Sequence, residues 1–220
     1  MSSARLNFVG FLGDGHEKVL CMCQEKPKKK SKGTPIRAKH GQYCSNGWFM
    51  LFDPISAHIV SVIQQREPEN NAIVCASLNK VIANYPRLDC FIYDRNCKFE
   101  AEGRATVSLK QIKVYPIDKW HAYKHDESCQ CSHLNVPSHK RRLKNINTSI
   151  AEQSFSWFRG YAKSFNELRP IRHRFLVLYF SAKHNALCDA KDMGHLNANK
   201  PSKKRGYVKQ SKGYACRKRK

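Results

Sequence analysis

Three acidic residues stand where carboxylates can share a metal site. Asp14 closes the apolar run Leu6–Gly13, Asp94 follows the apolar run Leu88–Tyr93, and Glu152 begins a segment with helical periodicity. Open α/β sheets build their sites from residues just beyond the strand ends. Three carboxylates gathered there predict two bound Mg²⁺ (or Mn²⁺) ions, which activate the attacking oxygen and stabilise the leaving oxygen in phosphoryl transfer.

Each of these acids also has a purely structural interpretation, which the residues alone leave open. Asp14 stands between two glycines and fits a turn, and Asp94 fits a turn or a helix N-cap. Ser149-x-x-Glu152 has the pattern of a capping box, which would explain Glu152 by helix initiation alone.

A second group of candidate ligands lies in a segment rich in His and Cys, at about residues 118–146. His121 and His125 are four residues apart and would share a helix face, and Cys129 and Cys131 follow them. Zinc binds four such ligands in a tetrahedron. We therefore expect a structural Zn²⁺ held by these four residues; the alternative is a solvated loop in which His121 alone serves the active site.

The order of motifs along the chain resembles the catalytic region of KDZ (Kyakuja, Dileera and Zisupton) transposases, members of the DDE superfamily with an RNase H-like fold. The family pattern has a strand ending in Tyr-Asp with a cysteine shortly after it, then an acid-x-x-His motif, then a helix with Glu-Gln before aromatic residues. The matching residues here are Tyr93-Asp94, Cys97, Asp118 to His121, Glu152-Gln153, Phe155 to Phe158 and His184-Asn185.

This resemblance covers roughly residues 6–186 and implies metal-assisted phosphodiester hydrolysis and strand transfer on DNA. It implies that the three acids named first form the catalytic triad, with Asp53 as the alternative to Asp14. Asp118 and His121 would act beside the triad. The first strand begins almost at Met1, so we expect a catalytic core, or a derivative of one that binds nucleic acid without catalysis.

The chain is strongly basic: 40 Lys and Arg against 17 Asp and Glu give a formal net charge of +23. Charge of this size indicates DNA as a partner, or a basic nucleolar or ribosome-associated protein that uses charge alone. The clusters at Lys26–Lys32 and Lys200–Arg205 are typical of nuclear import signals, so we expect a nuclear protein. The predicted DNA contacts are Lys140, Arg141, Arg142, Lys144 and Arg159.

Composition also limits the class of protein. With 220 residues, of which 41% are hydrophobic, the chain can bury a core. Its ten cysteines, without a recognisable secretory signal, are expected to be reduced. No apolar run reaches about 18 residues, so no membrane-spanning helix is expected. The sequence leaves open whether the chain forms a homo-oligomer.

The elements that position the candidate residues follow from hydrophobic periodicity. We expect strands at Leu6–Gly13, Val19–Cys23, Trp48–Phe52, Leu88–Tyr93 and Gln111–Ile117. We expect helices over Glu69–Ala83, from near Asn147, and from Pro170 to about Asn185. Together with the resemblance, this order predicts an α/β fold: an RNase H-like mixed sheet flanked by helices, with Leu88–Tyr93 central. Residues 1–190 would form this core, with an insertion at about 118–146, and residues 191–220 a basic disordered tail.

Overall fold

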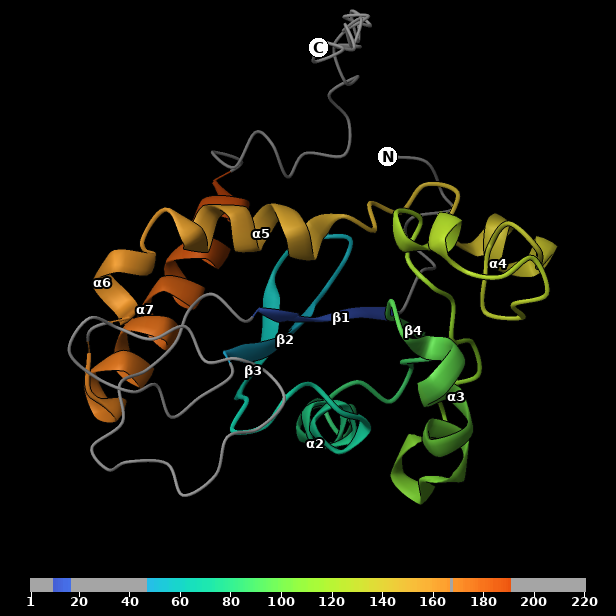
Figure 1. Cartoon of the computed structure of the whole chain (residues 1–220), viewed down its shortest axis with the longest axis horizontal. Coiled ribbons are helices and arrows are strands. Elements are labelled where there is room, and N and C mark those ends of the chain that lie inside the picture. The colour runs from blue at the N-terminus through green and yellow to red at the C-terminus, as the bar shows by residue number, and fades with distance from the viewer. Residues whose placement is uncertain (1–9, 17–46, 167, 191–220) are drawn as a thin grey trace, which may run out of the picture.

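A four-stranded sheet lies between two groups of helices in the computed structural model, which describes residues 10–16, 47–166 and 168–190 (Figure 1). The strands are β1 (Gly10–His16), β2 (Trp48–Phe52), β3 (Ile59–Gln64) and β4 (Cys90–Ile92). Their order is β3-β2-β1-β4; β1 and β4 run parallel, and the other two pairs are antiparallel. The predicted α/β class, with a mixed sheet flanked by helices, is confirmed.

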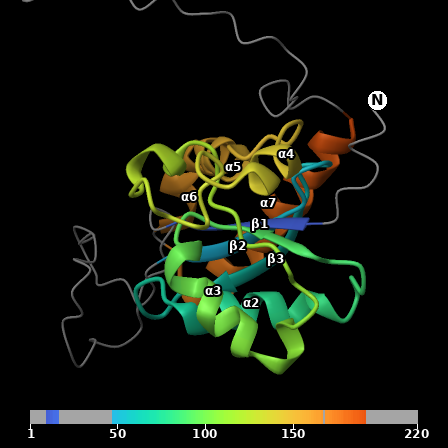
Figure 2. The same ribbon diagram turned by 90° about the vertical axis from the view of Figure 1, so that its right-hand side faces the viewer.

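Helices cover both faces of the sheet (Figure 2). One face packs against α5 (Ile150–Arg159) and α7 (Pro170–Asp189), the other against α2 (Asn71–Ile82) and α3 (Asn96–Ala105). The shorter elements are η1 (Val107–Leu109), η2 (His121–Lys124), α4 (Pro137–Arg142) and α6 (Ala162–Asn166). Within the described ranges, no helix has the length and apolar character needed to cross a bilayer.

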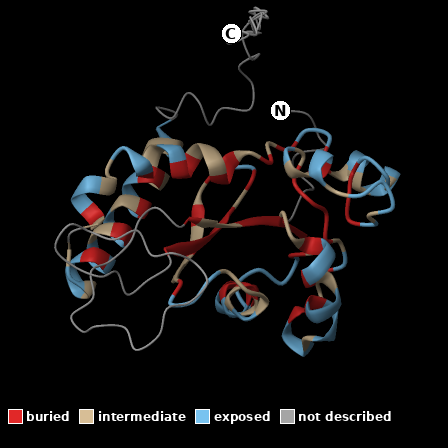
Figure 3. Cartoon of the chain, in the orientation of Figure 1, coloured by how far each residue is buried: buried red, intermediate tan, exposed pale blue. Residues whose placement is uncertain are grey.

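The core lies on both faces of the sheet, and β2 shows why its sequence is apolar throughout. Successive side chains of a strand point to opposite faces. Trp48, Met50 and Phe52 join the cluster beneath α5 and α7, and Phe49 and Leu51 join the cluster against α2. Because each face is covered, every residue of β2 is buried (Figure 3).

The expectation that Leu88–Tyr93 forms the central strand is wrong, because β4 is the last strand of the sheet. Its outer side is covered by the chain near Val114, which forms a single bridge with Cys90 where a strand over 111–117 was expected. The N–H of Phe91 donates to Val114 O at 2.9 Å. Pro116 has no N–H to continue such a ladder. This irregular neighbour buries β4 and accounts for its apolar run.

β1 continues past the point where the Gly-Asp-Gly pattern was expected to end it. Asp14 lies inside the strand, and Gly15 pairs with Phe49 of β2. A Cβ on Gly13 would lie 2.8 Å from ring atoms of both Phe49 and Phe91. The glycines therefore make room for side chains that pack across the strand, and the interpretation of Asp14 as a turn residue is wrong.

The remaining predicted elements are confirmed only in part. The three expected helices are present as α2, α5 and α7, but the pattern missed β3 and α3. α3 buries one large apolar side chain, Phe99, so its sequence carries little amphipathic signal. The segment 118–146 contains η2 and α4 joined by turns. The expected strand Val19–Cys23 and the expected tail 191–220 lie outside the described residues.

Candidate functional site

Asp14 and Asp94 are brought to one place by the parallel register of β1 and β4. Leu12 pairs with Ile92, and each acid follows two residues later in the same direction. Residues two apart on a strand share a face, and Leu12 and Ile92 belong to the core cluster beneath α5. Both carboxylates therefore line the pocket on this side of the sheet.

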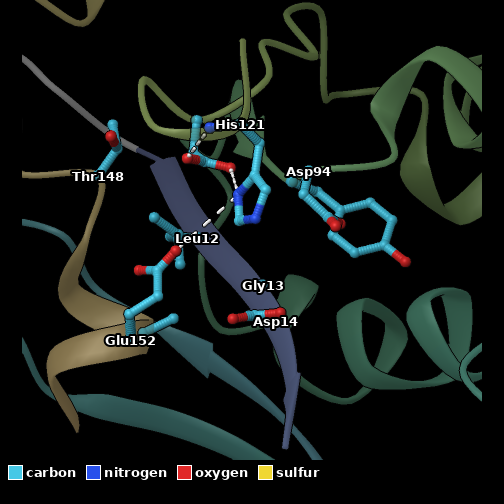
Figure 4. A pocket seen from close by; sticks show the side chains of 10 residues that line it. Leu12, Gly13, Asp14, Asp94, His121, Thr148 and Glu152 are labelled. Carbon is cyan, nitrogen blue, oxygen red and sulfur yellow. Dashed lines mark hydrogen bonds and ion pairs between the residues drawn. The ribbon is translucent and has the colours of Figure 1, made fainter. Parts of the chain in front are cut away.

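Glu152 reaches the same pocket from the first turn of α5. The buried residues Ala151, Phe155 and Phe158 pack this helix against the sheet. Ser149 is the N-cap residue, but its side chain makes no capping hydrogen bond within the described part of the chain. The capping-box interpretation is therefore wrong, and Glu152 projects toward the pocket instead (Figure 4).

The Asp118-x-x-His121 motif is a local turn in which the acid orients the imidazole. Asp118 Oδ1 accepts the N–H groups of Trp120 at 2.9 Å and of His121 at 3.0 Å, and Oδ2 lies 2.7 Å from His121 Nδ1. The N–H of Lys119 donates to Thr148 Oγ1 at 3.0 Å. This bond ties the motif to the residues that lead into α5.

These side chains line one small pocket (Figure 4). The lining includes all five residues that the sequence predicted for catalysis and consists of Leu12, Gly13, Asp14, Tyr93, Asp94, Asp118, His121, Thr148, Ala151 and Glu152.

The pocket holds its carboxylates in an environment that disfavours their charge. Burial raises the pKa of Asp14 well above its ordinary value, and the negative charges of Glu69, Glu152 and Asp94 raise it further. Burial also raises the pKa of Asp94 and of Glu152, while the charge of His121 opposes the shift in both. A divalent cation relieves this kind of repulsion.

The donor atoms of the pocket fit a metal ion. Asp118, His121 and Glu152 offer ligand atoms that all lie within 4.8 Å of one another, so this group could hold a metal ion. Asp94 Oδ1 and Glu152 Oε2 are buried oxygens that have no hydrogen-bond partner among the described residues. Buried polar atoms are normally paired. Two unpaired carboxylate oxygens in one pocket are therefore suited to a cation.

Glu69 is a further acid near the pocket that the sequence did not indicate. It stands just before the N-cap of α2, where an acidic residue fits an ordinary helix start. Tyr93 OH donates to Glu69 Oε1 at 2.5 Å, and burial raises the pKa of this carboxyl. A Cβ on Gly15 would lie 1.8 Å from Glu69 Oε2. Gly15 leaves space for the Glu69 carboxylate, but this role can be recognised only once the position of Gly15 in the sheet is known.

Asp53, the alternative to Asp14, is a turn residue. Its Oδ1 accepts the N–H of Ile55 at 2.9 Å, and its Oδ2 accepts the hydroxyl of Ser56 at 2.7 Å. β2 runs antiparallel to β1, so Asp53 follows β2 near the beginning of β1, at the end away from Asp14. Asp14 is therefore the acid that the fold brings to Asp94 and Glu152.

His121 does not lie with the other predicted zinc ligands, His125, Cys129 and Cys131. Its Nδ1 is held by Asp118, and its ring lines the acidic pocket. η2 ends at Lys124, and His125 has an extended backbone, so the two histidines do not share a helix face. His125 Nδ1 lies instead 3.9 Å from Cys129 Sγ.

The five basic residues predicted to contact DNA lie outside the pocket lining, on α4, just after it, and at the end of α5. Arg142 differs from the others because its guanidinium pairs with Asp89 and is half-buried. The remaining four are exposed: Lys140, Arg141, Lys144 and Arg159.

Comparisons of the chain with protein-family models, with curated proteins and with solved structures found no match. The structure by itself establishes an α/β fold with an acidic pocket whose Asp118, His121 and Glu152 could hold a metal ion.

Proposed function

We propose that this chain is the catalytic core of a metal-dependent enzyme that cuts and joins DNA, of the KDZ-like DDE transposase type with an RNase H-like fold. The observation that carries the proposal is the convergence of Asp14, Asp94 and Glu152, from three separate elements, on one small pocket. Structural ion pairs match acids with bases, whereas this pocket gathers four acids, Asp14, Asp94, Asp118 and Glu152, around one histidine. Such an arrangement costs free energy in the absence of a cation, which favours a functional origin.

The three acids would hold two Mg²⁺ or Mn²⁺ ions. Ions bound there would activate an attacking water or hydroxyl and stabilise the leaving oxygen of a phosphodiester. Asp94 and Glu152 each offer a buried oxygen with no hydrogen-bond partner among the described residues. Glu69, held by Tyr93, adds to the negative charge around Asp14.

His121 would act on the substrate strand. Asp118 Oδ2 engages its Nδ1, which fixes the ring orientation and favours a proton on Nδ1. Nε2 is then the atom available to accept a proton from the nucleophile or, when protonated, to donate to the phosphate. Thr148 and Lys119 keep this turn against the start of α5, so His121 and Glu152 stay at a fixed separation.

DNA is favoured as the substrate by charge and by size. The chain carries a formal net charge of +23 although its pocket is acidic. The pocket is small, so it would receive only the reacting phosphate of a longer molecule that lies across the surface. The exposed basic side chains of α4 lie outside the pocket lining and would contact neighbouring phosphates.

A nicking assay on supercoiled and linear duplex DNA, with Mg²⁺ or Mn²⁺ and with EDTA, tests the proposal. We expect nicking by the wild type that depends on the metal. Asp94→Asn and Glu152→Gln should each lower the rate by at least about a hundred-fold, since each removes a metal ligand. Both variants should bind DNA as well as the wild type or slightly better, because each loses a negative charge.

Glu67→Gln and Asp189→Asn are matched controls, because both remove an exposed carboxylate outside the pocket. Both should nick DNA at the wild-type rate. Wild-type protein that binds DNA but does not nick it in either metal would contradict the catalytic proposal. The chain would then be better described as a nucleic-acid-binding derivative of such a core.

A further inference from the structure

A second cluster of metal-binding side chains lies apart from the acidic pocket, between α3 and the segment that follows η2. His125 Nδ1 lies 3.7 Å from Cys97 Sγ and 3.9 Å from Cys129 Sγ. Cys97 is the second residue of α3, and Cys129 lies in the turns after η2. The imidazole therefore stands between two thiols that are 32 residues apart in the sequence.

Cys131 is the fourth member of this cluster. Its buried thiol lies 3.2 Å from Glu100 Oε2 on α3. Burial and this contact with Glu100 raise the pKa of Cys131, and the charges of Cys129 and Cys97 raise it further. Cys129 packs against the small buried cluster that Cys131 forms with Ile117 and Ala122, so these two thiols lie in one neighbourhood.

The separations of His125 Nδ1 from the sulfurs of Cys97 and Cys129 are close to those of ligands around a single metal ion. Zinc binds thiolate sulfur at about 2.3 Å and imidazole nitrogen at about 2.0–2.1 Å in a tetrahedron. A sulfur and a nitrogen on the same zinc ion are then about 3.6 Å apart, by tetrahedral geometry. The two measured separations, 3.7 and 3.9 Å, come close to this value before any metal draws the ligands together.

We propose that Cys97, His125, Cys129 and Cys131 bind one structural zinc ion. Three thiolates and one imidazole complete a tetrahedral set with no open position, which is typical of a structural rather than a catalytic site. The ligands must lose their protons on binding, and Cys131 must give up its contact with Glu100. Arg104, which already donates to Glu100 Oε1 at 2.6 Å, keeps that carboxylate paired.

The position of the zinc site gives it a role in holding the acidic pocket together. Cys97 follows Asp94 by three residues, and His125 follows His121 by four. A zinc ion at the cluster would fasten the start of α3 to the end of η2, and so fix two walls of the pocket against each other. The zinc site itself does not depend on the proposed function.

Metal analysis of full-length protein, purified without added metal or chelator, tests the proposal. We expect about one zinc per chain in the wild type. Cys97→Ser and Cys129→Ser should each reduce this to less than about a tenth. Cys75→Ser and Cys188→Ser are matched controls, since both remove a half-buried thiol elsewhere in the fold, and both should keep the zinc.

Two results of that analysis would overturn the proposal. One is wild-type protein that holds no zinc even after incubation with Zn²⁺. The other is zinc that survives in Cys97→Ser and Cys129→Ser but disappears in Asp118→Asn or Glu152→Gln, because the ion would then belong to the acidic pocket.

A variant can also lose zinc because it misfolds, so a second set of measurements uses the wild-type protein alone. Co²⁺ in place of Zn²⁺ should give the visible spectrum of a tetrahedral site, with thiolate charge-transfer absorption. Alkylation of the exposed Cys97 should be slow with zinc bound and fast after chelation, whereas alkylation of Cys75 should not change. An octahedral cobalt spectrum, or a Cys97–Cys129 disulfide found by mass spectrometry of freshly purified protein, would contradict the zinc site.

Discussion

Asp14 and Asp94 are neighbours because Leu12 of β1 pairs with Ile92 of β4 in a parallel register. Asp14 follows Leu12 by two residues, and Asp94 follows Ile92 by two residues. The acids are 80 positions apart in the sequence, and their charges interact across one pocket. A shift of one residue between β1 and β4 would turn one of the two side chains to the opposite face of the sheet. The site therefore depends on the pairing of these strands.

The acidic pocket predicts a dependence of stability on pH that a metal should reverse. The pKa values of Asp14, Asp94 and Glu152 are raised in the folded protein. Between the unfolded pKa, near 4, and the raised folded values, the native state binds more protons than the unfolded state. Without metal, the free energy of unfolding contributed by these groups is greatest at low pH and falls as pH rises through the folded pKa values.

Mn²⁺ bound to the ionised carboxylates should restore that stability. Thermal unfolding in EDTA and in Mn²⁺, at about pH 5 and about pH 8, measures the effect. We expect Mn²⁺ to raise the Tm by several degrees at the higher pH and by much less at the lower pH. A rise of several degrees corresponds to about 1 kcal/mol in the free energy of unfolding. An equal rise at both values would indicate binding that does not involve these groups.

Asp14→Asn should stabilise the metal-free protein. The amide removes a buried charge that Glu69, Glu152 and Asp94 all repel. We expect the free energy of unfolding at neutral pH in EDTA to increase by on the order of 1 kcal/mol, the scale of one pKa unit. The same variant should lose the rise in Tm that Mn²⁺ causes, which denaturant and thermal unfolding together would show.

Asp53→Asn is the matched control for this variant. Asp53 accepts hydrogen bonds from Ile55 and Ser56 in a turn. Its replacement should cost about 1 kcal/mol or less and leave the response to Mn²⁺ unchanged. If Asp53→Asn lost the rise in Tm caused by Mn²⁺ while Asp14→Asn kept it, Asp53 and not Asp14 would be the metal ligand.

Gly13→Ala should destabilise the fold by overpacking. The new Cβ would lie 2.8 Å from ring atoms of Phe49 and Phe91, which are fully buried and cannot move freely. We expect a loss of about 1–3 kcal/mol in urea unfolding. Gly160→Ala, at the exposed end of α5, should stay within about 0.5 kcal/mol of the wild type. Equal stability of the two variants would contradict the packing reason for Gly13.

The bond between Trp48 and His173 predicts a second, opposite dependence on pH. Trp48 Nε1 donates to His173 Nε2 at 2.9 Å, and His173 Nδ1 lies 3.0 Å from Phe165 O. The ring is therefore neutral, and burial lowers its pKa. Below the unfolded pKa of about 6.5, the unfolded state binds the extra proton, so stability from His173 is lost as pH falls.

Trp48→Phe removes the donor and leaves a buried nitrogen unsatisfied, at a cost of about 1–3 kcal/mol. Urea unfolding at about pH 7.5 and about pH 5.5 should show a smaller loss at the lower pH, because His173 of the variant, whose Nε2 no longer accepts from Trp48, can take up a proton there. Trp120→Phe, at an exposed tryptophan, should have little effect at either pH. The same loss at both pH values would show that packing, and not this bond, sets the role of Trp48.

Binding of duplex DNA should weaken steeply with salt if the exposed basic residues contact phosphate. Each phosphate contact contributes about −0.9 to the slope of log K against log salt concentration. Lys140→Gln combined with Arg141→Gln should therefore flatten the slope by about 2 in fluorescence anisotropy titrations. Arg142→Gln should instead lower stability, because its guanidinium is paired with Asp89. A slope that stays the same in the double variant would exclude α4 from the DNA contacts.

Local patterns in the sequence determined the elements whose apolar residues are closely spaced. β2 is an unbroken apolar run, and α5 carries its buried residues at helical spacing, so both could be predicted without knowledge of their partners. The acid-x-x-His motif was equally readable, because Asp118 and His121 interact within a single turn. Residues that act on neighbours a few positions away leave their signature in the sequence.

Only the tertiary structure decided how residues far apart in the sequence combine. From the sequence alone, the glycines beside Asp14 predict a turn. In the structure they lie in a strand, where Phe49 and Phe91 pack against Gly13 and Glu69 lies against Gly15. Cys97 lies beside His125 because the start of α3 contacts the segment that follows η2, whereas His121 is held by Asp118. Strand register and helix packing are long-range relationships, set by burial of the whole core, and the spacing of residues along the chain does not contain them.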